Sequence, residues 1–223
     1  MHENIVVIPY RNRQEQLDYF IKNTVPLFEK WLPNTKVVVV EQTDGKLFNR
    51  GALLNVGFKE YRNKTKYFIT HDVDINPNET IVRKIYTDNR NDVYRIKSAH
   101  NTSLGGVVKI SHDVIFNING FPNNIWGWGI EDRALYHRCC MRNVNITNNV
   151  DKDFHVLTHA PNAEVYIGEK KRISDMWGDN YISKLDENKK TELIMDSGLN
   201  NIEYKVIKRV SLHCHVELIQ VCI

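Results

Sequence analysis

The chain has 223 residues, of which 42% are hydrophobic and 26% charged, and its formal net charge is +3. This length and composition support one large domain with a substantial core and exclude disordered and collagen-like chains. The basic residues are scattered and no apolar run approaches the roughly 18 residues of a membrane-spanning helix, so we expect neither nucleic-acid binding nor a membrane span.

The first elements predict a β-α-β unit. Ile5–Pro9 and Val37–Val40 are short apolar runs rich in β-branched residues, which is typical of buried parallel strands. Apolar residues between positions 17 and 28 recur at helical spacing. A further helix is predicted over Ala52–Tyr61, followed by a strand over Tyr67–Thr70.

That third strand runs directly into His71-Asp72-Val73-Asp74. Its acids therefore lie at the carboxyl end of a sheet strand, the edge where open α/β sheets bind ligands. Carboxylates two residues apart share one face of an extended chain and suit Mg²⁺ or Mn²⁺. A solvated strand end is the structural alternative for such a triplet on its own.

The second half has weaker patterns. Residues 157–181 lack periodicity and contain Pro161, Gly168 and Gly178, which is typical of a long loop. No linker or change in composition interrupts the chain, so we expect one domain. The other elements predicted here are a strand over Val107–Ile110, helices over Asp113–Asn117 and Asp132–Arg142, and pairing strands within Ile202–Val206 and Leu212–Val221.

Three arginines follow predicted strands or loops at the ligand edge. Arg11 and Arg13 come directly after the first strand, and Arg50 follows Phe48-Asn49. Guanidinium forks match pairs of phosphate oxygens, although ordinary surface arginines have the same appearance in a sequence. Phe48 is either a core residue or a flat surface for a nucleobase.

The most informative segment is Trp126-Gly127-Trp128-Gly129, followed by Ile130, Glu131 and Asp132. Each glycine costs a helix interior roughly 1 kcal/mol relative to alanine, so this is a poor core helix. Flexible backbone beside large rings is typical of a sugar-binding loop. Glu131 and Asp132 begin the next helix, where carboxylates either cap the helix or perform chemistry.

Histidines and cysteines offer fewer clues. His155 and His159 are four residues apart and either complete a metal site or are buried, hydrogen-bonded histidines. We expect His213 and His215 to alternate on a strand as structural or surface residues. The cysteines have no C-x-x-C spacing, so we expect free thiols and no structural zinc site. They are Cys139, Cys140, Cys214 and Cys222.

Together these motifs resemble the β-1,4-galactosyltransferase family, with matching stretches in the family's order. The segment from Ile118 to Asp132 is similar to the family signature INGFPNNYWGWGGED. The other similar stretches are Ile8–Arg13, Phe48–Phe58, Asp72–Asp74, Gly105–Val107, and Asp196–Asn200 followed by Tyr204 and Val206.

The resemblance implies a GT-A fold, an α/β structure with a mostly parallel central sheet flanked by helices. It implies a single domain over 1–223, with the nucleotide-sugar and metal half in 1–110 and the acceptor half in 111–223. The loop at about 157–181 is expected to be mobile. The implied activity is inverting, Mn²⁺-dependent transfer of galactose from UDP-galactose to a sugar hydroxyl of a glycan or glycoconjugate.

The resemblance also assigns roles to residues. Asp132 matches the catalytic base and Glu131 an acid that contacts the donor sugar. Asp74 and His159 match metal ligands, with His155 as a further candidate ligand. Trp128 covers both donor and acceptor, and Arg133 lies at the acceptor site. The positions implied to bind the donor are Pro9, Arg11, Arg13, Phe48, Arg50, Asp72, Val73, Gly105, Gly106 and Trp128.

Two departures leave alternatives open. Arg133 replaces an aspartate that helps hold the family's acceptor, so the acceptor differs or the chain is a non-catalytic glycan-binding relative. Ser103-Leu104 replaces a bulky aromatic near the donor, which makes UDP-N-acetylgalactosamine an alternative donor.

Animal members of the family are Golgi proteins with an amino-terminal membrane anchor, whereas this sequence begins almost at its first predicted strand. As written, the sequence has no signal-peptide pattern. We therefore expect a soluble cytoplasmic or viral-factory enzyme, of the kind that a virus or microbe encodes. The Golgi lumen is expected only if an anchor has been removed.

Overall fold

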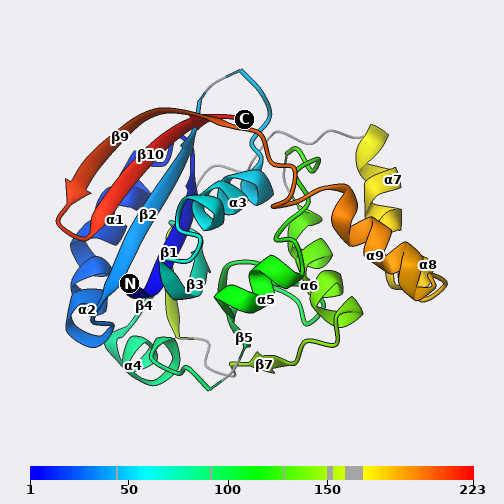
Figure 1. Ribbon diagram of the computed structural model, residues 1–223. Helices are drawn as coiled ribbons and strands as arrows, with labels where there is room; N and C mark the ends of the chain where they lie inside the picture. Colours follow the sequence, from blue (N-terminus) through cyan, green and yellow to red (C-terminus); the bar gives the residue numbers. More distant parts are fainter. Residues whose placement is uncertain (44, 91, 128, 150–152, 159–167) are drawn as a thin grey trace.

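A mixed eight-stranded sheet forms the centre of the molecule, in the order β7-β5-β6-β3-β1-β2-β10-β9 (Figure 1). The computed structural model describes residues 1–43, 45–90, 92–127, 129–149, 153–158 and 168–223, and for 168–170 the backbone only. The strands are β1 (His2–Tyr10), β2 (Thr35–Gln42), β3 (Thr65–His71), β5 (Val93–Lys97), β6 (Val107–Ser111), β7 (Ile146–Asn148), β9 (Lys205–His213) and β10 (Val216–Cys222).

The middle of the sheet is parallel. β1 pairs in parallel with both β2 and β3, and β10 extends the parallel block beyond β2. β6 runs antiparallel to β3, and the edge strand β9 runs antiparallel to β10. The structure thus confirms the predicted α/β fold with a mostly parallel central sheet, and the carboxyl ends of the parallel strands meet at one edge.

Helices cover both faces of the sheet (Figure 1). One face carries α1 (Gln14–Asn23), α2 (Val25–Trp31), α4 (Glu79–Ile81) and the π-helical turn η1 (Val82–Tyr86). The other face carries α3 (Arg50–Glu60), α5 (His112–Asn117) and α6 (Glu131–Met141). Neither these helices nor any other helix in the described ranges has the length and apolarity to cross a membrane.

The strand sequences account for this layering. In β1, Ile5 and Val7 point into the core beneath α3, whereas Val6 and Ile8 point into the core beneath α1 and α2. Val37–Val40 of β2 divide in the same alternating way. Because successive strand residues face opposite sides, a continuous apolar run supplies two cores at once.

The prediction of a long loop over residues 157–181 is wrong from Gly168 onward. Three helices follow here: α7 (Gly168–Met176), α8 (Asp179–Ile182) and α9 (Glu187–Asp196), which lie together beyond α6 in Figure 1. Trp177, Ile182 and Ile194 are buried with Ala134 and Met141 of α6 in a third apolar cluster. These apolar residues are widely spaced in the sequence, so only their common packing against α6 reveals that they form a core.

The carboxyl-terminal strands are also shifted from their predicted limits. Residues 202–204 precede β9, which extends to His213, and Cys214 and His215 form the turn into β10. Register decides these limits, because β10 pairs with β2 from Val216 onward. The prediction that His213 and His215 alternate on one strand is therefore wrong.

A small second sheet pairs β4 (Ile75–Pro77) with β8 (Phe154–Val156). Asn76 lies opposite His155, and the backbone N–H of Leu157 donates to the carbonyl of Asp74 at 2.9 Å. This pairing brings the chain after β8 next to the acids that follow β3.

Candidate active site

The centre of the site is an arginine held between two carboxylates. Arg50 donates from Nε to Oδ1 of Asp72 at 2.9 Å and from Nη1 to Oδ1 of Asp132 at 2.6 Å. Its side chain is 11% exposed, whereas those of Asp72 and Asp132 are 32% and 27% exposed. The arrangement joins the end of β3 to the first turns of α3 and α6, at the predicted ligand edge.

The loop between β2 and α3 holds Arg50 in place. Asn49 caps α3, because its Oδ1 accepts a hydrogen bond from the backbone N–H of Ala52 at 2.9 Å. The backbone N–H of Asn49 in turn donates to Oε1 of Gln42 at 2.8 Å. The last residue of β2 therefore sets the position at which α3, and with it Arg50, begins.

The start of α6 has an unusual backbone. Gly127, Gly129 and Ile130 have φ angles of 78°, 92° and 83°, a region that β-branched residues rarely adopt. Ile130 packs against the third apolar cluster, and its carbonyl accepts the N–H of Ala134 at 2.9 Å. Packing thus keeps a strained residue directly before Glu131 and Asp132.

A network of amides anchors the segment before α6 to α3. The side chain of Asn55 donates to the carbonyl of Phe121 at 2.7 Å and accepts from its N–H at 2.9 Å. From α6, the buried side chain of Arg138 donates to the carbonyls of Asn119 and Gly120 at 2.9 Å. The segment that the sequence singles out is therefore held from both sides, which keeps the first turn of α6 in register with α3.

Gly105 leaves room for the Asp132 carboxylate. A Cβ atom at position 105 would lie 2.1 Å from Oδ2 of Asp132, closer than atoms can approach. The backbone N–H of Leu104 also donates to the Asp132 carbonyl at 3.0 Å. The neighbouring Gly106 has a φ of +66°, and its carbonyl accepts the N–H of Asp72 at 3.1 Å. The glycine pair therefore lies against both acids that Arg50 binds.

Burial and charge shift the proton affinities of this cluster. Burial raises the pKa of Asp132, and Arg50 opposes that shift. Burial also raises the pKa of Glu131, with the nearby charge of Asp132 adding to the effect. Burial by itself would lower the pKa of Arg50, but Asp132, Asp72 and Glu131 outweigh it and raise the pKa. The arginine therefore stays charged and compensates the carboxylates around it.

The ionised form of Glu131 should destabilise the folded protein. The residue is 4% exposed, and its Oε2 has no hydrogen-bond partner among the described residues. Because its folded-state pKa is raised, ionisation opposes folding above that pKa, and the cost vanishes below the unfolded value of about 4.3. We expect Glu131→Gln, which mimics the protonated acid, to be more stable by about 1–3 kcal/mol at mildly alkaline pH.

Urea unfolding across the pH range measures this difference, which should shrink toward zero at about pH 4. Glu192→Gln is the matched control, because Glu192 is exposed on α9. The control should leave stability unchanged at every pH. If Glu131→Gln had the same stability as the natural chain at all pH values, the assigned cost of the buried charge would be wrong.

A second group of side chains lies along the loops after β1 and β2. Arg11 lies over the ring of Phe48 at 5.3 Å and donates to the carbonyl of Lys46 at 2.7 Å. The N–H of Gly127 donates to the Phe48 carbonyl at 2.8 Å, and Lys46 lies over the ring of Trp126 at 5.2 Å. Phe48 itself is partly buried against the core, so it has one packed side and one side toward Arg11.

Other predicted donor-site residues occupy the same edge. Pro9 is buried opposite Val40, beyond the last pairing of β1 with β3. Arg13 caps the start of α1 without a side-chain capping bond. Val73 is 7% exposed and packs in the core, so only its backbone can face a ligand.

A buried histidine that the sequence analysis left without a role supports the acids. His71 contacts the carbonyl of Asp72 through Nδ1 and the hydroxyl of Tyr86 through Nε2, both at 2.9 Å. Burial lowers its pKa to about 4, so it is neutral at physiological pH. Its position directly before the D-x-D triplet was the one signal in the sequence that could have indicated this role.

Comparisons with known proteins show the family to which this sequence is related. Residues 1–87 match the family model described as the N-terminal region of glycosyl transferase group 7, and residues 87–161 match that described as the N-terminal domain of galactosyltransferase. β-1,4-Galactosyltransferase 1 of Bos taurus is 31% identical over 219 residues, covering 93% of this chain and 51% of that protein. The chain belongs to the β-1,4-galactosyltransferase family.

Another member of the family is also similar in sequence. β-1,4-Galactosyltransferase 6 of Homo sapiens is 36% identical over 152 residues, which cover 64% of this chain and 39% of that protein. The chain thus spans about half the length, or less, of these two relatives.

Solved structures share the fold. A Drosophila β1,4-galactosyltransferase 7 mutant in complex with manganese, UDP-Gal and xylobiose has a TM-score of 0.80 at 20% identity, covering 100% of this chain and 94% of that one. Residues 1–349 of TarS from S. aureus, in complex with UDP-GlcNAc, have a TM-score of 0.57 at 13% identity, covering 87% and 71%. These likenesses establish the GT-A fold.

Three positions that the resemblance assigns to metal or sugar binding stay predictions. Trp128 and His159 lie outside the described residues. His155 is exposed, and its ring packs against Tyr19 of α1 with centroids 5.4 Å apart. Its role as a metal ligand therefore stays a prediction.

Arg133, which the resemblance assigns to the acceptor site, points toward α7. Its Nη2 donates to both the carbonyl and the hydroxyl of Ser174 at 2.6 Å. The substituted side chain thus ties the first turn of α6 to the helix that follows residues 159–167. In this β-1,4-galactosyltransferase relative, the position supplies a structural contact in addition to any effect on the acceptor.

Proposed function

We propose that this chain transfers galactose from UDP-galactose to a hydroxyl of a glycan acceptor, with inversion and with Asp132 as the general base. The observation that carries the proposal is the position of Asp132: partly exposed, held by Arg50, and facing a glycine that leaves it room. Family membership and the Drosophila relative's complex with manganese, UDP-Gal and xylobiose support the same class of reaction.

The chemistry of Asp132 suits proton abstraction. An inverting transfer needs one base to take the proton of the incoming hydroxyl as the new glycosidic bond forms. Burial raises the proton affinity of Asp132, which favours uptake of that proton, while Arg50 favours the ionised form that must be present beforehand. The hydrogen bond from Arg50, which also binds Asp72 after β3, orients the carboxylate for the acceptor.

We assign donor recognition to the loops after β1 and β2. Arg11 and Arg13 supply guanidinium groups for the diphosphate, and Phe48 offers a flat apolar surface for the uracil ring. The position of Arg11 over the ring of Phe48, 5.3 Å from its centroid, supports this assignment. Gly105 and Gly106 contribute indirectly, because the absence of a side chain at Gly105 leaves room for the Asp132 carboxylate and the Gly106 carbonyl accepts the N–H of Asp72.

The residues after β3 fit a divalent cation. Arg50 already compensates the charge of Asp72, so we assign the metal to Asp74 together with His159. The backbone N–H of Leu157, two positions before His159 in the sequence, donates to the carbonyl of Asp74 at 2.9 Å, which supports this assignment. A carboxylate with an imidazole suits Mn²⁺, which when bound supplies positive charge to the departing diphosphate.

UDP-N-acetylgalactosamine is the second candidate donor. Leu104 is fully buried in the core beneath α3, and the small side chain of Ser103 interacts with Ser98 at 3.4 Å. No bulky aromatic side chain therefore occupies the two positions before Gly105, which favours space for a larger substituent on the donor sugar.

The experiment is release of UDP from each donor with an array of glycan acceptors, with Mn²⁺ or with a chelator. We expect Mn²⁺-dependent, acceptor-dependent release, and linkage analysis of the product should show inversion. Exclusive use of UDP-galactose would reject the second donor. If the natural chain released no UDP from either donor yet bound glycans, it would be a binding protein and the proposal would be wrong.

A further inference from the structure

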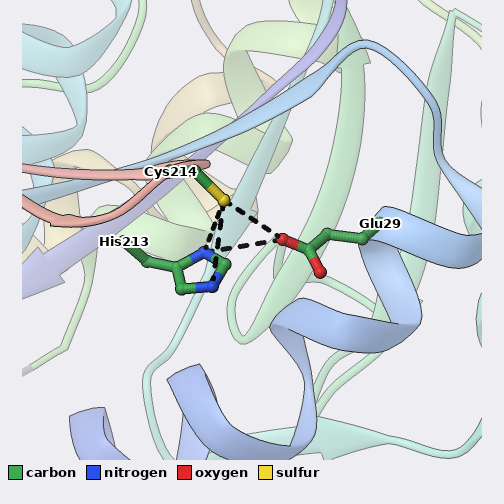
Figure 2. Close-up of side chains that lie close together, drawn as sticks. All are labelled: Glu29, His213 and Cys214. Atoms are coloured by element: carbon green, nitrogen blue, oxygen red, sulfur yellow. Dashed lines mark hydrogen bonds and ion pairs between the residues drawn. The ribbon is translucent and has the colours of Figure 1, made fainter.

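A second group of side chains with potential metal ligands lies at the turn after β9, beside α2. Glu29 of α2, His213 at the end of β9 and Cys214 in the following turn have ligand atoms within 4.8 Å of one another (Figure 2). Sγ of Cys214 lies 3.4 Å from Nδ1 of His213 and 3.7 Å from Oε1 of Glu29. Oε1 of Glu29 and Nδ1 of His213 are 3.5 Å apart.

These separations match a tetrahedral metal site. Zinc–ligand distances of about 2.0–2.3 Å require ligand atoms about 3.3–3.8 Å apart. Nδ1 of His213 also lies 3.5 Å from the backbone N–H of His215, at the outer limit of hydrogen bonding, so little is lost if its lone pair turns to a metal. One face of a tetrahedron is therefore present with almost no movement.

A fourth ligand is adjacent. Nε2 of His215 lies 3.7 Å from Oε1 of Glu29, and the two histidine rings are 6.3 Å apart. His215 is exposed, so its ring can rotate toward the other three ligands. The sequence His213-Cys214-His215 thus supplies three potential ligands from one turn, with Glu29 facing them from a helix.

We propose that Glu29, His213, Cys214 and His215 form a surface binding site for Zn²⁺, separate from the donor site. Thiolate and imidazole ligands select zinc and related transition metals over Mg²⁺, Mn²⁺ or Ca²⁺. The competing explanation is an ion pair between His213 and Glu29 without a metal. Their side chains are 38% and 35% exposed, so such a pair would contribute little to the stability of the fold. It would also give the thiol of Cys214 no role.

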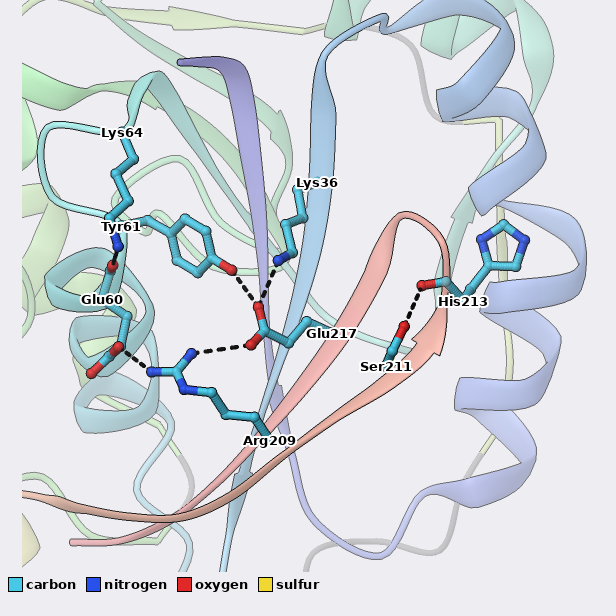
Figure 3. A network of polar contacts seen from close by, with 8 residues as sticks. All are labelled: Lys36, Glu60, Tyr61, Lys64, Arg209, Ser211, His213 and Glu217. Atoms are coloured by element: carbon cyan, nitrogen blue, oxygen red, sulfur yellow. Dashed lines mark hydrogen bonds and ion pairs between the residues drawn. The ribbon is translucent and has the colours of Figure 1, made fainter.

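The site would fasten the free end of an edge hairpin. Near its middle, β9 is held to α3 and β10 by Arg209, which contacts Glu60 and Glu217, while Tyr61 and Lys36 also contact Glu217 (Figure 3). At the turn, the Ser211 hydroxyl donates to the His213 carbonyl at 3.1 Å, which orders the backbone there. A metal would join this turn to α2, across the sheet from Arg209.

Cobalt is the direct probe, because a thiolate ligand gives Co²⁺ a ligand-to-metal charge-transfer band that oxygen and nitrogen ligands lack. We expect the chelator-treated chain to bind one equivalent of Co²⁺ with this band, and Zn²⁺ to abolish it by competition. A metal held by Asp74 and His159 would produce no such band, so the two sites are distinguished.

Three variants test the ligands. Cys214→Ser should eliminate the band, whereas Cys222→Ser, which removes another exposed thiol, should retain it. Glu29→Gln and His213→Gln should weaken Zn²⁺ binding at least about tenfold, the loss that even outer ligand partners cause. Zn²⁺ should raise the unfolding temperature of the natural chain and of Cys222→Ser by more than that of Cys214→Ser.

These side chains are exposed or half-buried, so the variants should fold, which circular dichroism checks. No charge-transfer band in the natural chain with excess Co²⁺, or a band that persists in Cys214→Ser, would overturn the proposal. Sugar transfer is expected to be unchanged in Cys214→Ser, because no residue of the cluster is among those assigned to donor binding or catalysis.

Discussion

Asp132→Asn is expected to lower the rate of sugar transfer by about 10²- to 10⁴-fold, the usual contribution of a general base, while UDP binding remains intact. Asparagine keeps an oxygen that can accept the hydrogen bond of Arg50 at this position, so the site should keep its shape. It cannot take up the proton of the acceptor hydroxyl. Steady-state rates and calorimetric titration with UDP and Mn²⁺ measure the two effects separately.

Asp113→Asn is the matched control for this change. The Asp113 side chain is fully exposed in the first turn of α5, where it contacts His112, so the same chemical change there should leave transfer unaltered. Wild-type-like turnover in Asp132→Asn would remove Asp132 from the role of base. Loss of UDP binding together with turnover would instead assign it to donor recognition.

Gly105→Ala is expected to reduce turnover by about 10²-fold, because a displacement of the reacting group of about 1 Å is enough for such a loss. The added methyl would lie 2.1 Å from Oδ2 of Asp132, so the carboxylate must move. The nearest atoms belong to the end of a side chain, which can rotate away. We therefore expect the unfolding temperature to change little.

Gly178→Ala provides the comparison for this substitution. Gly178 precedes α8 with a φ of −100°, and a Cβ there would approach no atom closer than the Asp175 carbonyl at 3.2 Å. That variant should retain nearly full turnover. If Gly105→Ala were as active as Gly178→Ala, the orientation of Asp132 would not depend on the space at position 105.

Much of the fold follows from local patterns. The runs Ile5–Pro9 and Val37–Val40 are short, apolar and rich in β-branched residues, which favours buried strands, and they do form the parallel centre of the sheet. The α3 helix is likewise predicted to within two residues at its start. Where apolar residues are sparse, as in α7–α9, packing against α6 rather than periodicity stabilises the helices. The prediction of a loop over 157–181 is therefore wrong from Gly168 onward, where α7 and α8 form.

Some properties of the candidate site also follow from the sequence, whereas others do not. The sequence by itself determined the chemical groups: the acids of the D-x-D triplet, Arg50, the glycine pair, and the carboxylates that begin α6. Motifs reveal these because each depends on residue type and close spacing. The strain at Ile130 and the raised pKa of Asp132 depend on surroundings that no short motif contains.

Only the tertiary structure decided which groups meet. Asp72 and Asp132 share Arg50 although they are 60 positions apart in the numbering, and Glu29 lies beside Cys214 across a separation of 185. Strand order and helix packing set these contacts, because the sheet brings distant chain segments to one edge or one face. Residue identity is local, whereas distance and burial arise from the whole chain, and the chemistry of a carboxylate or thiol depends on both.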